Sequence, residues 1–339
     1  MRRKHEPNMM DVARKAGVSQ RTVSNVVNNY QYVRPETRQR VQDAIRELGF
    51  VPNVAAQKLR MGSTGIVALA IPNVSWPYFA EMAHLIHKFV VENNRTLLVA
   101  ETEGNAEYER NTLEGFRSQV IDGLILSPIE LAAADLKEMK LGIPVVLLGE
   151  RISDVDHLHL SIDNVGAAQE VIFHLYEQGA RTFLIVGAMQ TVATASAGVL
   201  RYEGFTQAFE LCGVRSENWE LLPASPWTSE GAYGAMNDYL VSHQLPDAIV
   251  AMNDLLALGA LRACVDRGIR IPQDVLLTGW DDIEASRMSV PQITTVAPDK
   301  NRIAREAVAG LIAQMQGEKV AQTDVVVDHV FKVRESSQS

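Results

Sequence analysis

From residue 65 onward, the sequence alternates short aliphatic runs with longer amphipathic stretches. The runs are IVALAI, TLLVAET, GLILSP, PVVLLG, HLSID, TFLIVG, AIVAM and VLLTGW, and helices are predicted at residues 78–93 and 164–178. Residues 157–160, HLHL, alternate polar and apolar side chains, which predicts an edge strand. Strands that alternate with helices on this scale form parallel sheets whose faces the helices cover. The fold class is therefore predicted to be α/β over this part of the chain, with ligands bound at the carboxyl ends of the strands.

Motifs for catalysis and nucleotide binding are absent from the sequence. No GxGxxG follows a predicted strand, and GxxxxGK[ST], HExxH and GxSxG do not occur. His84 and His87 share one face of a predicted helix, but no third metal ligand accompanies them. The chain is therefore not expected to be an enzyme, and neither a metal nor a cofactor is expected.

Charge is distributed unevenly along the chain. Residues 1–62 contain 12 Lys and Arg against 5 Asp and Glu, whereas residues 63–339 contain 20 against 36. A compact basic segment is attracted to polyanions through the release of counterions, and an acidic segment is repelled by them. Residues 1–62 are therefore predicted to be a nucleic-acid-binding module.

Cysteine usage and hydropathy indicate the compartment. Cys212 and Cys264 are the only two cysteines, and nowhere do eighteen apolar residues follow one another. Two cysteines far apart in sequence are typical of a reducing cytosol, and a membrane-spanning helix needs a longer apolar run. We therefore expect a cytoplasmic protein with no membrane partner.

The segment GVSQRTVSNVVNN, residues 17–29, predicts a short helix with one apolar and one polar face. With Ser19 as N-cap, its valines fall in one sector. The polar face carries Gln20, Arg21, Ser24, Asn25 and Asn28. A helix that ends at Gly17 precedes it, and another begins at Pro35 and ends at Gly49. This order is typical of a helix-turn-helix, in which the second helix enters the major groove, although a solvated surface helix has the same pattern.

DVARKAGVSQRTVSNVVNN and VRPETRQRVQDAIRELGFVPNVAAQKLR resemble the N-terminal part of the lactose and galactose repressor family of bacterial transcription regulators. The match is dense across residues 8–60. It implies that the residues that read bases are Gln20, Arg21 and Asn25. It also implies that the residues that contact phosphates are Ser19, Thr22, Ser24 and Asn28. Position 25 is often arginine or histidine in the family; asparagine favours adenine and arginine favours guanine, so the half-site is expected to differ there.

The stretch PNVAAQKLRMG predicts a short helix that begins after Asn53. So short a helix is marginal in water without a partner. The family resemblance implies a hinge helix that folds when two subunits meet over the minor groove, with Leu59 wedged into the central base step. Asn53, Ala56 and Leu59 are accordingly expected to contact DNA.

Polar and aromatic residues follow several of the predicted strands. They are Asp163, Arg201, Trp227, Asn253, Asp254, Asp281 and Asp282. Such side chains suit a polyhydroxylated ligand, whose hydroxyls need hydrogen-bond partners and whose C–H face stacks on an indole ring. Helix capping and salt bridges are the alternative role for the same residues.

The segment AIVAMNDLLALGALRACVDRGIRIPQDVLLTGWDDIEASRMSVPQITTV is similar, more loosely, to the effector-binding half of the same family. This resemblance implies ligand contacts for Asp163, Arg201, Trp227, Asn253 and Asp281. The matching stretch IPNVSWPYFAEM adds Asn73, Tyr78 and Phe79. Lys300 stands where some members have an aromatic residue, which suits an anionic ligand or a lysine that reaches solvent.

The resemblance also implies a body like a periplasmic sugar-binding protein, with two α/β subdomains and parallel sheets. We expect a helix-turn-helix domain at residues 1–52, a hinge helix and linker at 53–62, and an effector-binding and dimerisation domain at 63–339. Subdomain one is expected at about 63–163 and 295–323, and subdomain two at about 164–294 and 324–334. Three crossing strands are expected near residues 164, 294 and 324.

These features predict a sequence-specific DNA-binding transcriptional regulator, specifically a repressor. Its affinity for a pseudo-palindromic operator duplex is expected to be controlled allosterically by a small-molecule effector, a sugar or sugar derivative; the sequence favours neither an inducer nor a corepressor. A homodimer is expected because one helix-turn-helix reads one half-site. The apolar stripe of helix 78–91 suits either the dimer interface or intramolecular packing. The alternative function is a cytosolic solute-binding or sugar-acting protein without a regulatory role.

Overall fold

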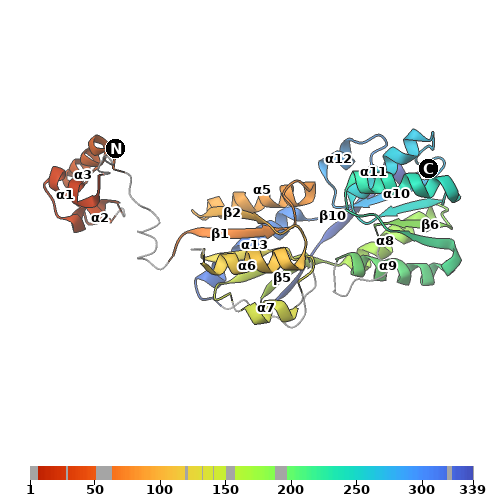
Figure 1. Cartoon of the computed structure of the whole chain (residues 1–339), viewed down its shortest axis with the longest axis horizontal. Coiled ribbons are helices and arrows are strands. Elements are labelled where there is room, and N and C mark those ends of the chain that lie inside the picture. The colour runs from red at the N-terminus through yellow and green to blue at the C-terminus, as the bar shows by residue number, and fades with distance from the viewer. Residues whose placement is uncertain are drawn as a thin grey trace. The chain divides into compact units, whose positions relative to one another are not determined.

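The computed structural model describes residues 7–27, 30–50, 63–118, 121–131, 133–139, 141–149, 157–187, 197–318 and 323–338. The chain divides into two compact units, Met1–Thr64 and Gly65–Ser339, which we call the head and the body (Figure 1). Within the described ranges, no helix is both long and apolar enough to cross a membrane.

The described part of the head contains three helices: α1 (Met9–Ala16), α2 (Gln20–Val27) and α3 (Pro35–Leu48). Asn8 begins α1 with a capping box, because its side chain accepts the N–H of Asp11 while the Asp11 carboxylate accepts the N–H of Asn8. Gly17 ends α1 at a φ of 64°, in the left-handed region that favours glycine. The Ser19 hydroxyl accepts the N–H of Thr22 at 3.1 Å, so α2 begins with the predicted N-cap.

One small core joins the three helices of the head. Its buried members are Val12, Ala13, Ala16, Val23, Val26, Val41, Ala44 and Phe50, and half-buried Val27, Ile45 and Leu48 pack against them. Each helix contributes the apolar stripe that its sequence predicts, which leaves the polar face of α2 outside the core. The predicted three-helix arrangement is confirmed.

The body contains two six-stranded sheets. In spatial order, the first sheet consists of β2 (Thr96–Glu101), β1 (Ile66–Ile71), β3 (Gly123–Leu126), β4 (Val145–Leu148), β5 (Leu158–Ile162) and β11 (Asp324–Val327), all parallel. The second consists of β7 (Trp219–Leu222), β6 (Phe183–Val186), β8 (Ala248–Ala251), β9 (Leu276–Trp280), β10 (Thr294–Pro298) and β12 (His329–Lys332). Only the β10–β12 pairing in this sheet is antiparallel. The α/β fold class with parallel sheets is confirmed.

Helices cover both faces of the first sheet. One face packs on α5 (Pro77–Glu92) and α13 (Lys300–Met315), and the other packs on α6 (Ala106–Ser118) and α7 (Ala133–Met139). Alternate residues of strand β1 point to the two faces of the sheet. Val67, Leu69 and Ile71 pack with α5 and α13 on one face, whereas Ala68 and Ala70 pack with α6 and α7 on the other. A strand buried on both faces reads as a continuous apolar run, which is what IVALAI is.

Five helices are associated with the second sheet: α8 (Asn164–Glu177), α9 (Ala197–Cys212), α10 (Ser229–Ser242), α11 (Asp254–Asp266) and α12 (Glu284–Met288). Two short 3-10 helices, Ser216–Asn218 and Glu335–Ser337, belong to the same part of the body. Helices α8 and α9 approach closely at Gly204, where an added Cβ would lie 2.4 Å from the carbonyl oxygen of Val165. Only glycine fits at so close a contact between two helices.

The prediction of an edge strand at residues 157–160 is wrong. Strand β5 lies between β4 and β11, and His159 is 2% exposed. The covering strand β11 comes from the far end of the chain, so the pattern around His159 could not reveal it. The edges of the first sheet are β11 and β2.

The chain passes between the two sheets at three aspartates. Asp163 follows β5, Asp299 follows β10, and Asp328 separates β11 from β12. The sequence analysis placed these passages near residues 164, 294 and 324. The N–H of Asp299 donates to the carbonyl oxygen of Asp328 at 3.1 Å, so two of the three crossing segments lie side by side.

Candidate functional site

The polar face of α2 is one candidate site. Gln20 and Arg21, at the N-terminal end of the helix, are exposed, and Thr22, Ser24 and Asn25 are half-buried. Exposed side chains in the first turn of the second helix have the placement that base reading in a major groove requires. Asn28, Asn53, Ala56 and Leu59 lie outside the described residues, as does the predicted hinge helix.

Two tyrosines that the sequence analysis did not select follow α2. The rings of Tyr30 and Tyr32 meet edge to face with centroids 5.5 Å apart, and the two residues are 51% and 77% exposed. The N–H of Tyr30 donates to the carbonyl oxygen of Asn25 at 2.9 Å, and Arg38 donates to the carbonyl oxygen of Tyr30 at 2.7 Å. The contacts made by the backbone of Tyr30 hold this aromatic pair beside the C-terminal end of α2.

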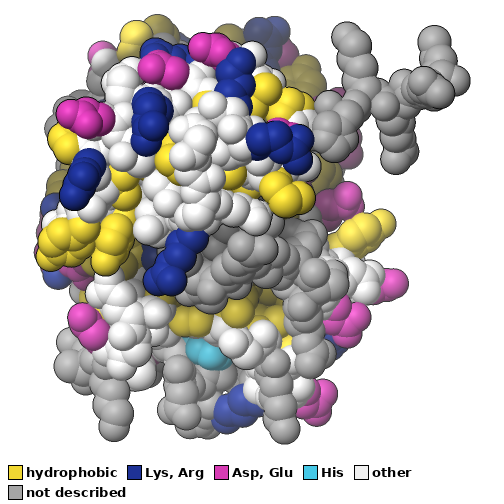
Figure 2. Space-filling view, turned by 90° about the vertical axis from the view of Figure 1, so that its left-hand side faces the viewer, with side chains coloured by type: hydrophobic (Ala, Val, Ile, Leu, Met, Phe, Trp, Pro, Cys, Tyr) yellow, Lys and Arg dark blue, Asp and Glu magenta, His cyan; other side chains and the backbone are white. Residues whose placement is uncertain are grey.

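Basic side chains are dispersed over the surface drawn in Figure 2. Lys and Arg side chains appear singly across the upper part of this face, between uncharged side chains and a few Asp and Glu, rather than as one continuous patch. Charge spread in this way suits several separate contacts to phosphates better than one concentrated anion site.

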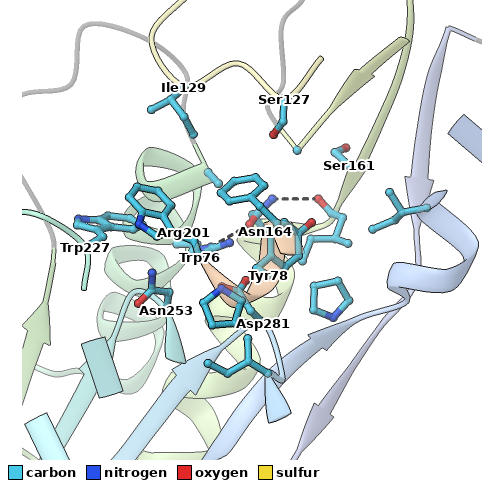
Figure 3. Close-up of a pocket in the computed structure, with 18 of the residues that line it drawn as sticks. Trp76, Tyr78, Ser127, Ile129, Ser161, Asn164, Arg201, Trp227, Asn253 and Asp281 are labelled. Atoms are coloured by element: carbon cyan, nitrogen blue, oxygen red, sulfur yellow. Dashed lines mark hydrogen bonds between the residues drawn. The ribbon is translucent and has the colours of Figure 1, made fainter. Parts of the chain in front are cut away.

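The second candidate site is a cavity in the body (Figure 3). Its polar and aromatic lining residues are Trp76, Tyr78, Phe79, Ser127, Ser161, Asn164, Arg201, Trp227, Asn253 and Asp281. Most of these residues lie at or just after the carboxyl ends of parallel strands from both sheets, where α/β proteins bind ligands, and Tyr78, Phe79 and Arg201 come from the N-terminal parts of α5 and α9. Aromatic walls with a few polar groups are typical of a small-molecule site.

The structure brings six of the nine predicted ligand residues together in this cavity: Tyr78, Phe79, Arg201, Trp227, Asn253 and Asp281. The other three are not among its lining residues. Asn73 accepts the N–H and the hydroxyl of Ser75 and so shapes the turn after β1. Asp163 caps α8 by accepting the N–H of Gly166 at 2.9 Å, and Lys300 forms an ion pair with Glu81.

Arg201 provides a buried positive charge at the cavity and is 9% exposed. Its Nε donates to the amide oxygen of Asn164 at 3.1 Å, a bond drawn as a dashed line in Figure 3, and its Nη1 donates to the carbonyl oxygen of Met252. Its guanidinium also lies over the ring of Trp280. These contacts come from α8, β9 and the segment after β8, so the orientation of Arg201 is set before any ligand binds.

Asp281 directs a carboxylate toward the same cavity from the turn after β9. Its φ is 104°, and that of Asp282 is 50°, a conformation that costs about 1–3 kcal/mol for a non-glycine residue and that is concentrated at functional sites. Burial raises the pKa of Asp281 to about 7. A carboxyl with this pKa can accept or donate a hydrogen bond near neutral pH, depending on its proton.

The neighbouring acids Asp254 and Asp282 have structural roles. Asp254 is fully buried and accepts the Thr295 hydroxyl at 2.7 Å and the Ile283 N–H at 2.9 Å. Burial opposes ionisation of Asp282, but hydrogen bonds from Lys332 and Arg334 outweigh burial and lower its pKa. Helix capping and ion pairing, the alternative that the sequence left open, therefore account for Asp163 and Asp282, whereas Asp254 is an internal hydrogen-bond acceptor.

Sequence reasoning missed several residues of the cavity. They are Trp76, Ser127, Ile129, Ser161 and Asn164. Ser127, like the selected residues, directly follows an apolar run, GLIL, so its position was a usable signal. Ile129 carried no such signal, because its loop is placed by the buried carboxylate of Glu109 on α6, which accepts the N–H of Ile129 at 2.7 Å and that of Leu131 at 2.9 Å.

Comparisons with known proteins decide the family. Residues 8–53 match the model of bacterial regulatory proteins of the lacI family, and residues 172–337 match that of the periplasmic binding protein-like domain. The HTH-type transcriptional repressor PurR of Haemophilus influenzae (strain PittEE) is 32% identical over 311 residues, which are 90% of this chain and 90% of that protein. The chain belongs to the lacI family of bacterial regulatory proteins.

Solved structures resemble this lacI-family regulator along nearly its whole length. A complex of the transcriptional regulator CelR with cellobiose is 27% identical, with a TM-score of 0.70 over 97% of this chain and 99% of that one. A lac repressor dimer bound to operator and the anti-inducer ONPF has a TM-score of 0.87 over 99% and 100%, at 21% identity, and shares the fold. Because the relatives are transcriptional repressors, the prediction of a DNA-binding regulator rather than an enzyme is confirmed.

Proposed function

We propose that this lacI-family regulator is a cytoplasmic repressor whose affinity for operator DNA is controlled by a sugar-type effector bound in the body cavity. The observation that carries the proposal is the convergence of four aromatic side chains with amide, hydroxyl, guanidinium and carboxyl groups at the carboxyl ends of both sheets. We call the first sheet with its helices the first half of the body, and the second sheet with its helices the second half. A ligand held in the cavity contacts both halves, so its binding can favour one arrangement of the halves over another.

The chemistry of the cavity suits a small polyhydroxylated molecule. The indole rings of Trp76 and Trp227 offer faces on which the C–H surface of a sugar ring can stack. Asp281 offers acceptors for hydroxyls, and the amide nitrogens of Asn253 and Asn164 are donors; the side-chain oxygen of Asn253 caps α11 by accepting the N–H of Leu256 at 2.8 Å. The similar regulator CelR was solved with a sugar, cellobiose, which supports the same ligand class for this chain.

We infer that the head reads DNA with the first turns of α2. In this proposal Gln20, Arg21 and Asn25 contact base edges and Ser19, Thr22 and Ser24 contact phosphates, which the exposure of Gln20 and Arg21 in the first turn supports. Asn28, Asn53, Ala56 and Leu59 are proposed contacts from the family resemblance alone.

A homodimer on a pseudo-palindromic operator completes the proposal. Burial of Met82, Ile86 and Val90 in the core of the body supports intramolecular packing for most of the apolar stripe of α5. The neighbouring edge strand β2 instead exposes Leu98 and Val99, at 38% and 39%, beside the paired strand β1. An apolar edge strand of this kind is suited to burial against a second copy.

The experiment that tests the proposed function has two stages. Thermal-shift screening of the full chain with sugars, phosphorylated sugars and nucleobases identifies ligands that stabilise the folded protein. Each hit is then added to an operator-binding titration, with Trp227→Ala as the variant that removes a cavity wall and Trp219→Ala as a control from strand β7. The proposal predicts a sugar hit that changes operator affinity and is lost in Trp227→Ala. A nucleobase hit, or a sugar that leaves operator affinity unchanged, would overturn the effector assignment.

A further inference from the structure

An ion pair on the first half of the body bonds to a turn of the second half beside the cavity. Lys300, the first residue of α13, pairs with Glu81 on α5, and both helices pack on the first sheet. The ammonium group of Lys300 also donates to the carbonyl oxygens of Asp281 at 2.9 Å and Asp282 at 3.2 Å, in the turn that follows β9 of the second sheet. The lysine side chain is 12% exposed and that of Glu81 is 31% exposed, so this contact is largely shielded from solvent.

Glu81 touches the same turn directly. Its Oε1 accepts the N–H of Glu284 at 3.4 Å, while its Oε2 binds Lys300. The two side chains of the pair therefore hold the segment 281–284 at its first and last residues. A charged pair that bonds to backbone groups on the opposite half of the body fixes position as well as charge.

The turn requires such support because its backbone is unfavourable on its own. Asp281 and Asp282 both have positive φ values, 104° and 50°. Two N–H groups of the turn bond firmly within the second half: that of Asp281 donates to the carbonyl oxygen of Val296 at 2.8 Å, and that of Ile283 donates to the Asp254 carboxylate at 2.9 Å. The carbonyl oxygen of Asp281 bonds instead to Lys300, from the first half, and that of Asp282 accepts both Lys300 at 3.2 Å and Arg287 of the second half at 2.7 Å.

We propose that Glu81 and Lys300 are positioning residues of the effector site, which fix the turn 281–284 so that the Asp281 carboxyl faces the bound ligand. The inference rests on the proposed function in one respect, namely that the cavity is the effector site. It also gives Lys300 a different role from the two that its sequence position suggested. Its ammonium is bound by the protein itself, so it neither reaches solvent nor waits for an anionic ligand.

The charges of Lys300 and Glu81 act on the pKa of Asp281 in opposite directions, so the effects of the two residues can be told apart. Apart from burial, Arg201 and Lys300 lower the pKa of Asp281, whereas Asp254 and Glu81 raise it. Removing the charge of Lys300 should therefore raise the pKa of Asp281, and removing the charge of Glu81 should lower it. A general loss of packing would not produce shifts of opposite sign.

The first measurement needs no ligand. The full chain labelled with 13Cγ-aspartate is titrated by NMR, and the Asp281 signal is assigned from its absence in Asp281→Asn. Lys300→Met is expected to raise the Asp281 pKa and Glu81→Gln to lower it. Glu306→Gln is the matched control, because Glu306 pairs with Arg302 at 2.7 Å on the same helix α13 and has the same charge change. An Asp281 pKa that is the same in both variants and in the wild type would overturn the inference.

The second measurement follows the turn and the cavity. Hydrogen exchange of the segment 281–284 is expected to accelerate roughly tenfold in Lys300→Met and Glu81→Gln but not in Glu306→Gln, as the loss of a charged hydrogen bond implies. The exchanged pair Glu81→Lys with Lys300→Glu should not restore slow exchange, because a carboxylate cannot donate to the two carbonyl oxygens. If the exchanged pair restored slow hydrogen exchange, the ion pair alone would suffice, and the proposed positioning of the turn by Lys300 would be refuted.

Cellobiose, the ligand of the similar CelR structure, serves as the affinity probe. Its binding is expected to weaken roughly tenfold in both single variants and to stay unchanged in Glu306→Gln. Unchanged cellobiose affinity in both variants would count against positioning. Failure of the wild-type chain to bind cellobiose would count against the sugar effector, while the Asp281 titration and hydrogen exchange still decide the positioning role.

Discussion

The guanidinium of Arg201 lies over the ring of Trp280, with its central carbon 4.1 Å from the ring centroid. Trp280 is the last residue of β9, and Asp281 follows it directly. Arg201 also binds Asn164 at the start of α8 and the carbonyl oxygen after β8. The side chain of Arg201 thus connects α8, β9 and the segment after β8, which all contribute residues at the cavity, and we expect the arrangement of these residues to depend on it.

Replacing Arg201 tests this dependence. Arg201→Lys keeps the charge but loses the planar group that stacks on Trp280 and reaches two oxygens at once. We expect the free energy of unfolding to fall by about 2–3 kcal/mol in urea denaturation, together with loss of effector binding. Arg262→Lys is the control, since Arg262 is 68% exposed in a pair with Asp266 on α11, and it should leave both measurements unchanged. Equal stability of the two variants would contradict the prediction.

Asp254 should make stability depend on pH. Burial raises its pKa from 3.8 to about 6 in the folded protein. A carboxyl with a higher pKa when folded stabilises the fold when protonated, so its contribution is fully present below about pH 3.8 and is lost as the pH rises through about 6. Relative to Asp254→Asn, the wild-type free energy of unfolding should therefore decrease across this window, by about 3 kcal/mol in all. Urea denaturation of both proteins from pH 4 to pH 7 gives the wild-type free energy of unfolding minus that of Asp254→Asn. This value should fall as the pH rises, and a value that rises with pH would refute the assignment.

Two glycines should respond oppositely to the same substitution. An added Cβ at Gly204 would lie 2.4 Å from the carbonyl oxygen of Val165 and 2.7 Å from the Cβ of Ala168, so Gly204→Ala should destabilise the body by about 1–3 kcal/mol. No atom lies within 4 Å of the corresponding position at Gly234, inside α10. Gly234→Ala should stabilise by about 0.5–1 kcal/mol, because alanine loses less backbone freedom on folding. Thermal denaturation compares the two, and a stabilising Gly204→Ala would show that α8 and α9 are not packed as described.

Asn25 should determine one base of each half-site. Asparagine pairs with adenine through two hydrogen bonds and arginine pairs with guanine, so Asn25→Arg should change the preference from A·T to G·C at one position, by about 1–3 kcal/mol. Selection of bound sequences from a random duplex library measures this change. Gln42→Arg adds the same charge at an exposed position of α3 and should strengthen binding to DNA in general without altering base preference. An unchanged preference in Asn25→Arg would exclude base reading by residue 25.

Much of the fold was predictable from local sequence patterns. The N-cap Ser19 and the stops at Gly17 and Gly49 mark helix ends that the structure contains. The eight apolar runs became strands, all of them buried except the edge strand β2, and six of nine expected ligand residues line one cavity. These features were visible because caps, periodicity and strand-end positions are properties of a few neighbouring residues.

Other features depended on residues far apart in the chain. His159 is interior because β11 covers it, and Lys300 is held by Glu81 and by the turn at Asp281. Likewise, Ile129 reaches the cavity because Glu109 holds its loop. None of these pairings leaves a local periodic signal.

Sequence alone determined many of the helices and strands, the strand ends that carry polar groups, and which part of the chain is basic, because short-range sterics, hydrogen bonding and charge decide these properties. Only the tertiary structure decided the order of strands in the two sheets, where the chain crosses between them, and which polar residues face the cavity rather than cap a helix. Those choices depend on burial and on ion pairs between distant segments, and such contacts exist only once the chain has folded.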